Sequence, residues 1–111
     1  MTETTSQILS ITAKNFEAEV LHSELPVLLD YWAPWCQPCQ MMMPAFEAVA
    51  ADYAGKIKFG KLNIDTDSEI AARYNVRGVP TLMLFKGGNP EDARTGAQSK
   101  SQLIAMIDNA L

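Results

Sequence analysis

The chain contains two cysteines, Cys36 and Cys39, in the motif W-C-Q-P-C. A long apolar run precedes them and the longest helix-like stretch follows, so a helix should begin here. Residues three apart on a helix share a face, which places the two sulfur atoms within disulfide reach. The free N–H groups at a helix start favour an anion and lower the pKa of Cys36. Because a thiolate is the nucleophile of disulfide exchange, this pattern indicates redox chemistry.

The proline between the cysteines supports this interpretation. Pro38 lacks an N–H, which matters little in a first helical turn, and its ring stiffens the segment. Cys39 lies one turn into the helix, so it should be the more buried thiol and stay protonated until it is needed.

Spacing alone leaves three further roles open for the pair. A zinc site needs four ligands, and the single histidine, His22, belongs to a different predicted helix. Two chains could pool four cysteines around a metal or an iron–sulfur cluster, although the intervening proline disfavours this. The cysteines could also be plain core residues. The residues that flank the pair favour redox work over all three, and we expect no metal.

Composition narrows the class of protein. The chain has 111 residues, of which 48% are hydrophobic and 20% charged, as in one globular domain. A net charge of −4 without any basic run argues against nucleic-acid binding. We expect residues 1–6 to be a flexible tail and residues 7–111 to be a single domain.

The sequence also predicts a location. The first residues, M-T-E-T-T-S-Q, carry an acid where a signal peptide carries Lys or Arg, and no apolar segment follows. The apolar run near residues 26–35 is too short to span a membrane. We therefore expect a cytoplasmic monomer with no membrane association. In that reducing compartment a structural disulfide is disfavoured, so a metal-binding or redox role for the C-x-x-C pair is expected.

Hydrophobic patterning predicts an α/β fold. Residues 26–32 form a continuous apolar run, which is typical of a central strand covered on both faces. Ser99 and Gln102 form a capping box before the last helix. The predicted strands cover residues 8–11, 26–32, 57–64, 81–86 and 92–95. The predicted helices cover residues 14–22, the stretch from the cysteines to Gly55, residues 67–75, and the region after Ser99. Asp67 should cap the third of these helices, and Asn75 should end it in a left-handed conformation. Alternating elements give a parallel first half, and the tight turn at residues 87–90 makes the last two strands antiparallel.

Several segments together resemble the thioredoxin family, from about Ser10 to Leu111. They are D-Y-W-A-P-W-C-Q-P-C, K-L-N-I-D, R-G-V-P-T-L, F-K-G-G and the pair G-A at residues 96–97. The resemblance implies the thioredoxin fold, a central five-stranded mixed sheet flanked by four helices.

The resemblance also implies a mechanism and a site. Cys36 would attack a protein disulfide and Cys39 would resolve the mixed disulfide. Pro80 would be a cis-proline beside the pair, and the backbone of Val79 would bind an extended substrate segment. The implied docking surface consists of Trp35, Gly78, Val79, Gly96 and Ala97. Thioredoxin reductase, which uses a flavin and NADPH, would recharge the pair; this chain has no dinucleotide fingerprint and should bind no cofactor itself.

Asp30 interrupts the apolar run, where burial is costly for a carboxylate and raises its pKa. Lys61 is the partner that the resemblance implies. The pair could be a structural ion pair. Alternatively Asp30 could accept the proton of Cys39, through water, during the resolving step. We favour the second interpretation.

Two residues depart from the family pattern C-G-P-C-K. Gln37 replaces a glycine and adds a polar side chain at the rim; Gln40 replaces a lysine and removes a positive charge. The loss of charge should raise the pKa of Cys36 and make the couple slightly more reducing. These changes suggest an alternative to a general protein-disulfide reductase, namely a dedicated redox partner with few clients. A separate alternative is a non-catalytic binding module, in which a partner occupies the docking surface and the cysteines are incidental.

Overall fold

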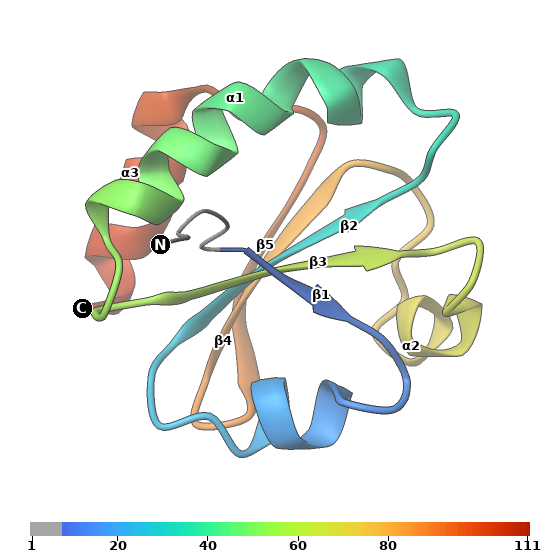
Figure 1. The fold of residues 1–111 in the computed structure, drawn as a ribbon, viewed down its shortest axis with the longest axis horizontal. Helices are drawn as coiled ribbons and strands as arrows, with labels where there is room; N and C mark the ends of the chain where they lie inside the picture. Colours follow the sequence, from blue (N-terminus) through green and yellow to red (C-terminus); the bar gives the residue numbers. More distant parts are fainter. Residues whose placement is uncertain (1–7) are drawn as a thin grey trace, which may run out of the picture.

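The computed structural model describes residues 8–111, which form a five-stranded sheet in the order β1-β3-β2-β4-β5 with helices on both faces (Figure 1). The strands are β1 (Ile8–Ile11), β2 (Val27–Trp32), β3 (Lys58–Asn63), β4 (Thr81–Lys86) and β5 (Asn89–Thr95). The helices are the π-helical turn η2 (Glu17–Leu21), α1 (Gln37–Asp52), α2 (Ser68–Arg73) and α3 (Lys100–Ala110). The predicted tail at residues 1–6 lies outside the described residues.

Strand directions make the sheet mixed, as predicted. β3 pairs in parallel with both β1 and β2, whereas β4 is antiparallel to both β2 and β5. The first five residues of the central strand β2 are buried, which explains why its sequence is apolar on both faces.

Neighbouring side chains of β2 enter two separate cores. Leu28 packs with α1 and α3 on one face, in a cluster that includes Phe46 and Leu103. Leu29 points to the other face, where Phe16 and Ile70 belong to the second cluster. α1 and α3 therefore cover one side of the sheet, while η2 and α2 cover the other (Figure 1).

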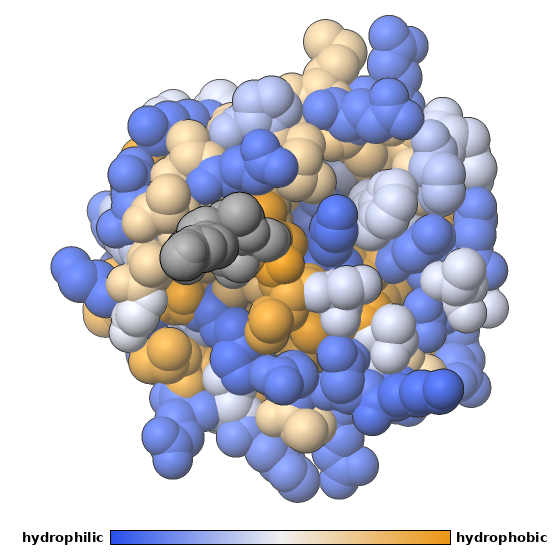
Figure 2. All heavy atoms as spheres, in the orientation of Figure 1, coloured by the Kyte–Doolittle hydropathy of each residue, from blue (hydrophilic) through white to orange (hydrophobic). Residues whose placement is uncertain are grey.

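The outer surface is mixed in character. In the view of Figure 2 hydrophilic residues dominate the rim, and hydrophobic residues gather toward the middle, in the region where β1 and β3 run. Leu9 of the edge strand β1 is among the large apolar side chains that stay exposed.

The first predicted helix is wrong in extent and type. The helix is limited to the π-helical turn Glu17–Leu21 and the helical Phe16 before it, and the N–H of His22 donates to the carbonyl of Glu17 at 3.0 Å. The preceding residues form a turn instead, because the side chain of Asn15 accepts the N–H of Thr12 at 2.7 Å. Local side-chain bonds of this kind compete with regular helix.

Asp67 occupies the N-cap position of α2 as predicted, but its side chain does not cap the helix. Asp67 makes no capping bond; its carboxylate accepts the N–H of Ala13 at 2.9 Å and the hydroxyl of Thr66 at 2.7 Å. A contact with a distant loop has therefore replaced the local cap. Asn75 does end the helical region with a left-handed φ of 60°, as predicted.

Near the C-terminus, the capping box of Ser99 and Gln102 is confirmed by both of its hydrogen bonds. β5 begins at Asn89, earlier than predicted, and includes Pro90. Because β5 is an edge strand, a proline without an N–H can be accommodated there.

Candidate active site at the Cys36–Cys39 pair

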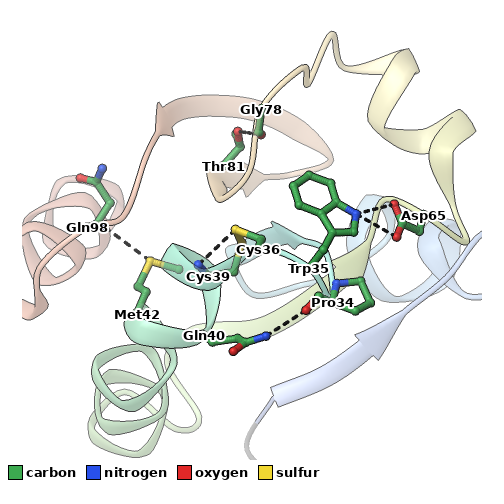
Figure 3. The surroundings of a disulfide bond; sticks show 10 residues. All are labelled: Pro34, Trp35, Cys36, Cys39, Gln40, Met42, Asp65, Gly78, Thr81 and Gln98. Atoms are coloured by element: carbon green, nitrogen blue, oxygen red, sulfur yellow. Dashed lines mark hydrogen bonds between the residues drawn. A yellow bond between two sulfur atoms is a disulfide. The ribbon is translucent and has the colours of Figure 1, made fainter.

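The two cysteines form a disulfide where β2 gives way to α1. Cys36 is the N-cap of α1 and Cys39 lies in its first turn, with their Cα atoms 5.3 Å apart. The N–H of Cys39 donates to the sulfur of Cys36 at 3.2 Å (Figure 3). The structure thus places Cys36 at the helix start, with a backbone donor aimed at its sulfur, as the sequence predicts.

Burial differs little between the two cysteines. Cys36 is 3% exposed and Cys39 is 1% exposed, so both are buried in the disulfide form. They pack with Ala33, and the half-buried Trp32, Ile64 and Val79 complete this small apolar cluster. The predicted difference in burial therefore has the expected direction but is small.

The loop before β4 lies beside the pair. The Val79–Pro80 peptide bond is cis, and Pro80 is buried. The hydroxyl of Thr81 donates to the carbonyl of Gly78 at 2.7 Å, and the N–H of Gly96 donates to the carbonyl of Pro80 at 2.8 Å. The first bond fixes the loop before β4 internally, and the second joins that loop to the loop after β5.

The loop that follows β5 is also tied to α1. Ala97 is exposed and lies between Gly96 and Gln98. The N–H of Gln98 donates to the sulfur of Met42 at 3.5 Å (Figure 3). The bonds of its two neighbours, Gly96 and Gln98, therefore hold Ala97 near the cysteine pair.

Trp35 is the most prominent exposed side chain beside the pair. It is 67% exposed, and its indole N–H donates to both carboxylate oxygens of Asp65, at 3.1 and 3.3 Å. Sequence reasoning missed this partner. Trp32 pairs with Asn63 at the ends of β2 and β3, so the residues that follow leave the sheet side by side, but the bond itself depends on the path of the loop after β2.

The two glutamines of the motif have different surroundings. Gln37 and Pro38 are exposed at the first two positions of α1. The side-chain amide of Gln40 donates to the carbonyl of Pro34 at 2.9 Å (Figure 3). This bond was not expected from the sequence, which suggested only a missing charge at position 40.

Asp30 is fully buried in β2, opposite Lys61 on β3. Burial raises the pKa of Asp30 to about 7, and the positive charge of Lys61 opposes that rise. Neither carboxylate oxygen has a hydrogen-bond partner among residues 8–111. The Lys61 ammonium instead lies 5.5 Å from the ring centre of Trp32. The pair is therefore aligned by the sheet without a direct bond.

Two negative findings concern residues 8–111. Within this range no group of three or more potential ligands among His, Cys, Asp and Glu is arranged to hold a metal ion. In the same part of the chain, no helix has the length and apolar character needed to cross a membrane.

Comparison with known proteins gives a consistent result. Residues 7–109 match the family model described as Thioredoxin. The chain is 54% identical to a thioredoxin of Pseudomonas aeruginosa over 101 residues, which covers 91% of this chain and 94% of that protein. It is 49% identical to a thioredoxin of Allochromatium vinosum, covering 92% and 95% of the two chains. It is 43% identical to thioredoxin 1 of a Nostoc species, covering 96% and 99%. With the fold, the oxidised C-x-x-C pair and these matches, the chain belongs to the thioredoxin family of thiol–disulfide oxidoreductases.

Proposed function

We propose that Cys36 is the attacking cysteine and Cys39 the resolving cysteine of a protein-disulfide reductase. The observation that carries this assignment is the backbone N–H of Cys39, which points at the sulfur of Cys36 at the start of α1. A donor in that position stabilises a thiolate on Cys36 once the disulfide is reduced.

The reaction transfers two electrons from the reduced pair to the client. The Cys36 thiolate forms a bond to one client sulfur, the client S–S bond breaks, and the departing client thiolate takes a proton. Cys39 then loses its proton and attacks the sulfur of Cys36. The mixed disulfide breaks, the second client sulfur leaves as a thiolate and takes a proton, and the Cys36–Cys39 disulfide remains.

We assign Asp30 as the acceptor of the Cys39 proton, with water as the carrier. Burial raises the pKa of Asp30 to about 7, so near neutral pH this carboxyl can both take up and release a proton. Lys61 lies opposite it in the sheet, and its positive charge opposes the rise in the pKa of Asp30. Within residues 8–111 no side chain or backbone group bonds the Asp30 oxygens, which supports their availability for a proton.

We assign client docking to the surface around Cys36. Val79 packs against the cysteine cluster and would offer its backbone to an extended client segment. Trp35 gives this surface a large exposed ring, and the bond from Gly96 to Pro80 supports a place for Gly96 and Ala97 at its border. Gly78, whose carbonyl is held by Thr81, completes the surface.

In the cell, the oxidised pair would be returned to the dithiol by thioredoxin reductase at the expense of NADPH. We propose that the protein acts as a monomer in the cytoplasm without a bound cofactor. A narrower client range is the second candidate, because the exposed Gln37 alters the rim beside Cys36. A non-catalytic binding module is disfavoured because it would not need the buried Asp30 next to Lys61.

The test is NADPH-coupled reduction of insulin with thioredoxin reductase, followed as NADPH consumption. We expect turnover with the wild-type chain and none with the Cys36→Ser, Cys39→Ser double variant. If the reductase reduces the wild-type chain readily but the chain does not reduce insulin, the protein has a narrow client range and is not a general reductase. If the double variant instead keeps the function that the wild-type chain has in the cell, the chain is a binding module.

A further inference from the structure

Gln40 links the first turns of α1 to the loop that precedes Cys36. Its side-chain amide donates to the carbonyl of Pro34 at 2.9 Å, and both residues are exposed (Figure 3). A hydrogen bond between two exposed groups adds little to overall stability, because water can replace either partner. Its effect should therefore be sought in the local geometry of the loop.

The loop between β2 and α1 has backbone bonds at its base. The N–H of Cys36 donates to the carbonyl of Ala33 at 3.1 Å, and the N–H of Gln40 donates to the carbonyl of Cys36 at 3.3 Å. The Gln40 side chain adds a further connection across the same loop. Trp35 lies within the segments closed by the Cys36–Ala33 bond and by the Gln40–Pro34 bond, whereas the Gln40–Cys36 bond lies in the first turn of α1 after it.

Trp35 is held from a second direction by its own side chain. Its indole N–H donates to both oxygens of Asp65, which follows β3. The ring is nevertheless 67% exposed. An exposed aromatic side chain that is already fixed loses less conformational entropy when a partner covers it. Trp35 thus has the properties of a preorganised docking anchor.

We propose that Gln40 is a positioning residue that holds the Trp35 segment ready for disulfide-bonded protein clients. The inference rests on the proposed function, because it assumes that Trp35 docks clients. The amide of Gln40 is neutral and its donor is engaged by Pro34, so Gln40 acts on docking more than on the Cys36 thiolate. A large client covers Trp35 and benefits from the fixed loop, whereas a small disulfide reaches Cys36 without it.

Gln40→Met tests the inference, since methionine matches the length of glutamine and lacks the donor. The pre-reduced protein is mixed with increasing insulin in single-turnover experiments, and in parallel with a small aromatic disulfide. We expect the half-saturating insulin concentration to rise about two- to five-fold, the size of one exposed neutral hydrogen bond. The limiting rate and the rate with the small disulfide should not change.

Two further variants separate docking from general effects. Glu47→Met places a methionine at another exposed site of α1 and should leave all three quantities unchanged. In a Trp35→Ala background, Gln40→Met should not change the half-saturating insulin concentration any further, because Gln40 acts through Trp35. The backbone order parameter of Trp35, measured by ¹⁵N relaxation, should fall in Gln40→Met and stay unchanged in Glu47→Met.

An unchanged half-saturating concentration in Gln40→Met would overturn the inference, as would an equal effect in the Trp35→Ala background. Both results would leave the proposed function intact, provided that the wild-type protein reduces insulin. If the wild-type dithiol fails to reduce insulin or the small disulfide, the proposed function fails and this inference fails with it.

Discussion

Asp30 and Lys61 lie directly opposite each other on the parallel strands β2 and β3, yet neither carboxylate oxygen of Asp30 has a hydrogen-bond partner within residues 8–111. The charge of Lys61 is close enough to lower the pKa of Asp30, while its ammonium group lies over the Trp32 ring. The carboxyl is therefore desolvated and only weakly compensated. Such a group reduces stability and remains available for proton transfer.

Replacing this carboxyl should slow one chemical step. Asp30→Asn removes the proton acceptor of Cys39, so the mixed disulfide should form at the wild-type rate and resolve at least about ten-fold more slowly near pH 7. Stopped-flow measurement of the two phases with a disulfide-bonded client would separate them. A wild-type resolving rate in Asp30→Asn would remove Asp30 from the mechanism.

The same residue predicts how stability depends on pH. Asp30 ionises near 3.8 in an unfolded chain and near 7 in the folded protein, so the folded state binds the extra proton between these values. Its contribution to the free energy of unfolding should fall as pH rises from about 4 to 7, by roughly 4 kcal/mol, and then level off.

Urea unfolding of the oxidised protein at several pH values tests this, because the disulfide cysteines do not titrate. Asp30→Asn should lose this fall and be more stable than the wild-type protein at pH 8. Parallel pH profiles for the two proteins would show that Asp30 is ionised normally.

A positive charge at position 40 should change the redox pair. Gln40→Lys should lower the pKa of Cys36 in the reduced protein and make the couple slightly more oxidising, because the thiolate gains a nearby cation. Lysine can still donate to Pro34, so the loop contact is kept. Thiolate absorbance and equilibration with glutathione give the two quantities; equal values in both proteins would refute an electrostatic effect of position 40.

The turn between β4 and β5 offers a test of packing. A Cβ at Gly88 would lie 2.7 Å from the carbonyl oxygen of Leu21, and Gly88 has a φ of +82°. Gly55 has a similar φ of +86° but no atom within 4 Å of its would-be Cβ. Gly55→Ala should therefore cost about 1 kcal/mol for its backbone conformation, and Gly88→Ala about 1 kcal/mol more. Thermal unfolding compares them; equal losses would argue against the close approach of this turn to η2.

Much of the fold could be predicted because local signals and packing agree. The apolar run of β2 and the capping box at Ser99 each determine a structure within a few residues. The side chain of Asp67 does not cap α2, because the backbone of a distant loop competes for the same carboxylate. No local pattern reveals such a competitor, so the error has a tertiary origin.

The candidate site also combines features that the sequence predicts with features that depend on tertiary structure. The spacing of Cys36 and Cys39 predicts their meeting at a helix start, which the structure confirms. The bonds from Trp35 to Asp65 and from Gln40 to Pro34 depend on how a loop turns after β2. From the residue type alone, Gln40 is only a position that lacks the positive charge of a lysine. Its bond to Pro34 becomes evident once the path of the backbone is known.

Trapping the covalent intermediate tests most directly whether Cys36 attacks and Cys39 resolves. The Cys39→Ser and Cys36→Ser variants are mixed with the same disulfide-bonded client, and the covalent adducts are quantified by mass spectrometry under non-reducing conditions. We predict a stable adduct on Cys36 in Cys39→Ser and a reaction at least about ten-fold slower in Cys36→Ser, whose remaining thiol lacks the helix-start position. An adduct that forms as fast on Cys39 as on Cys36 would contradict these roles.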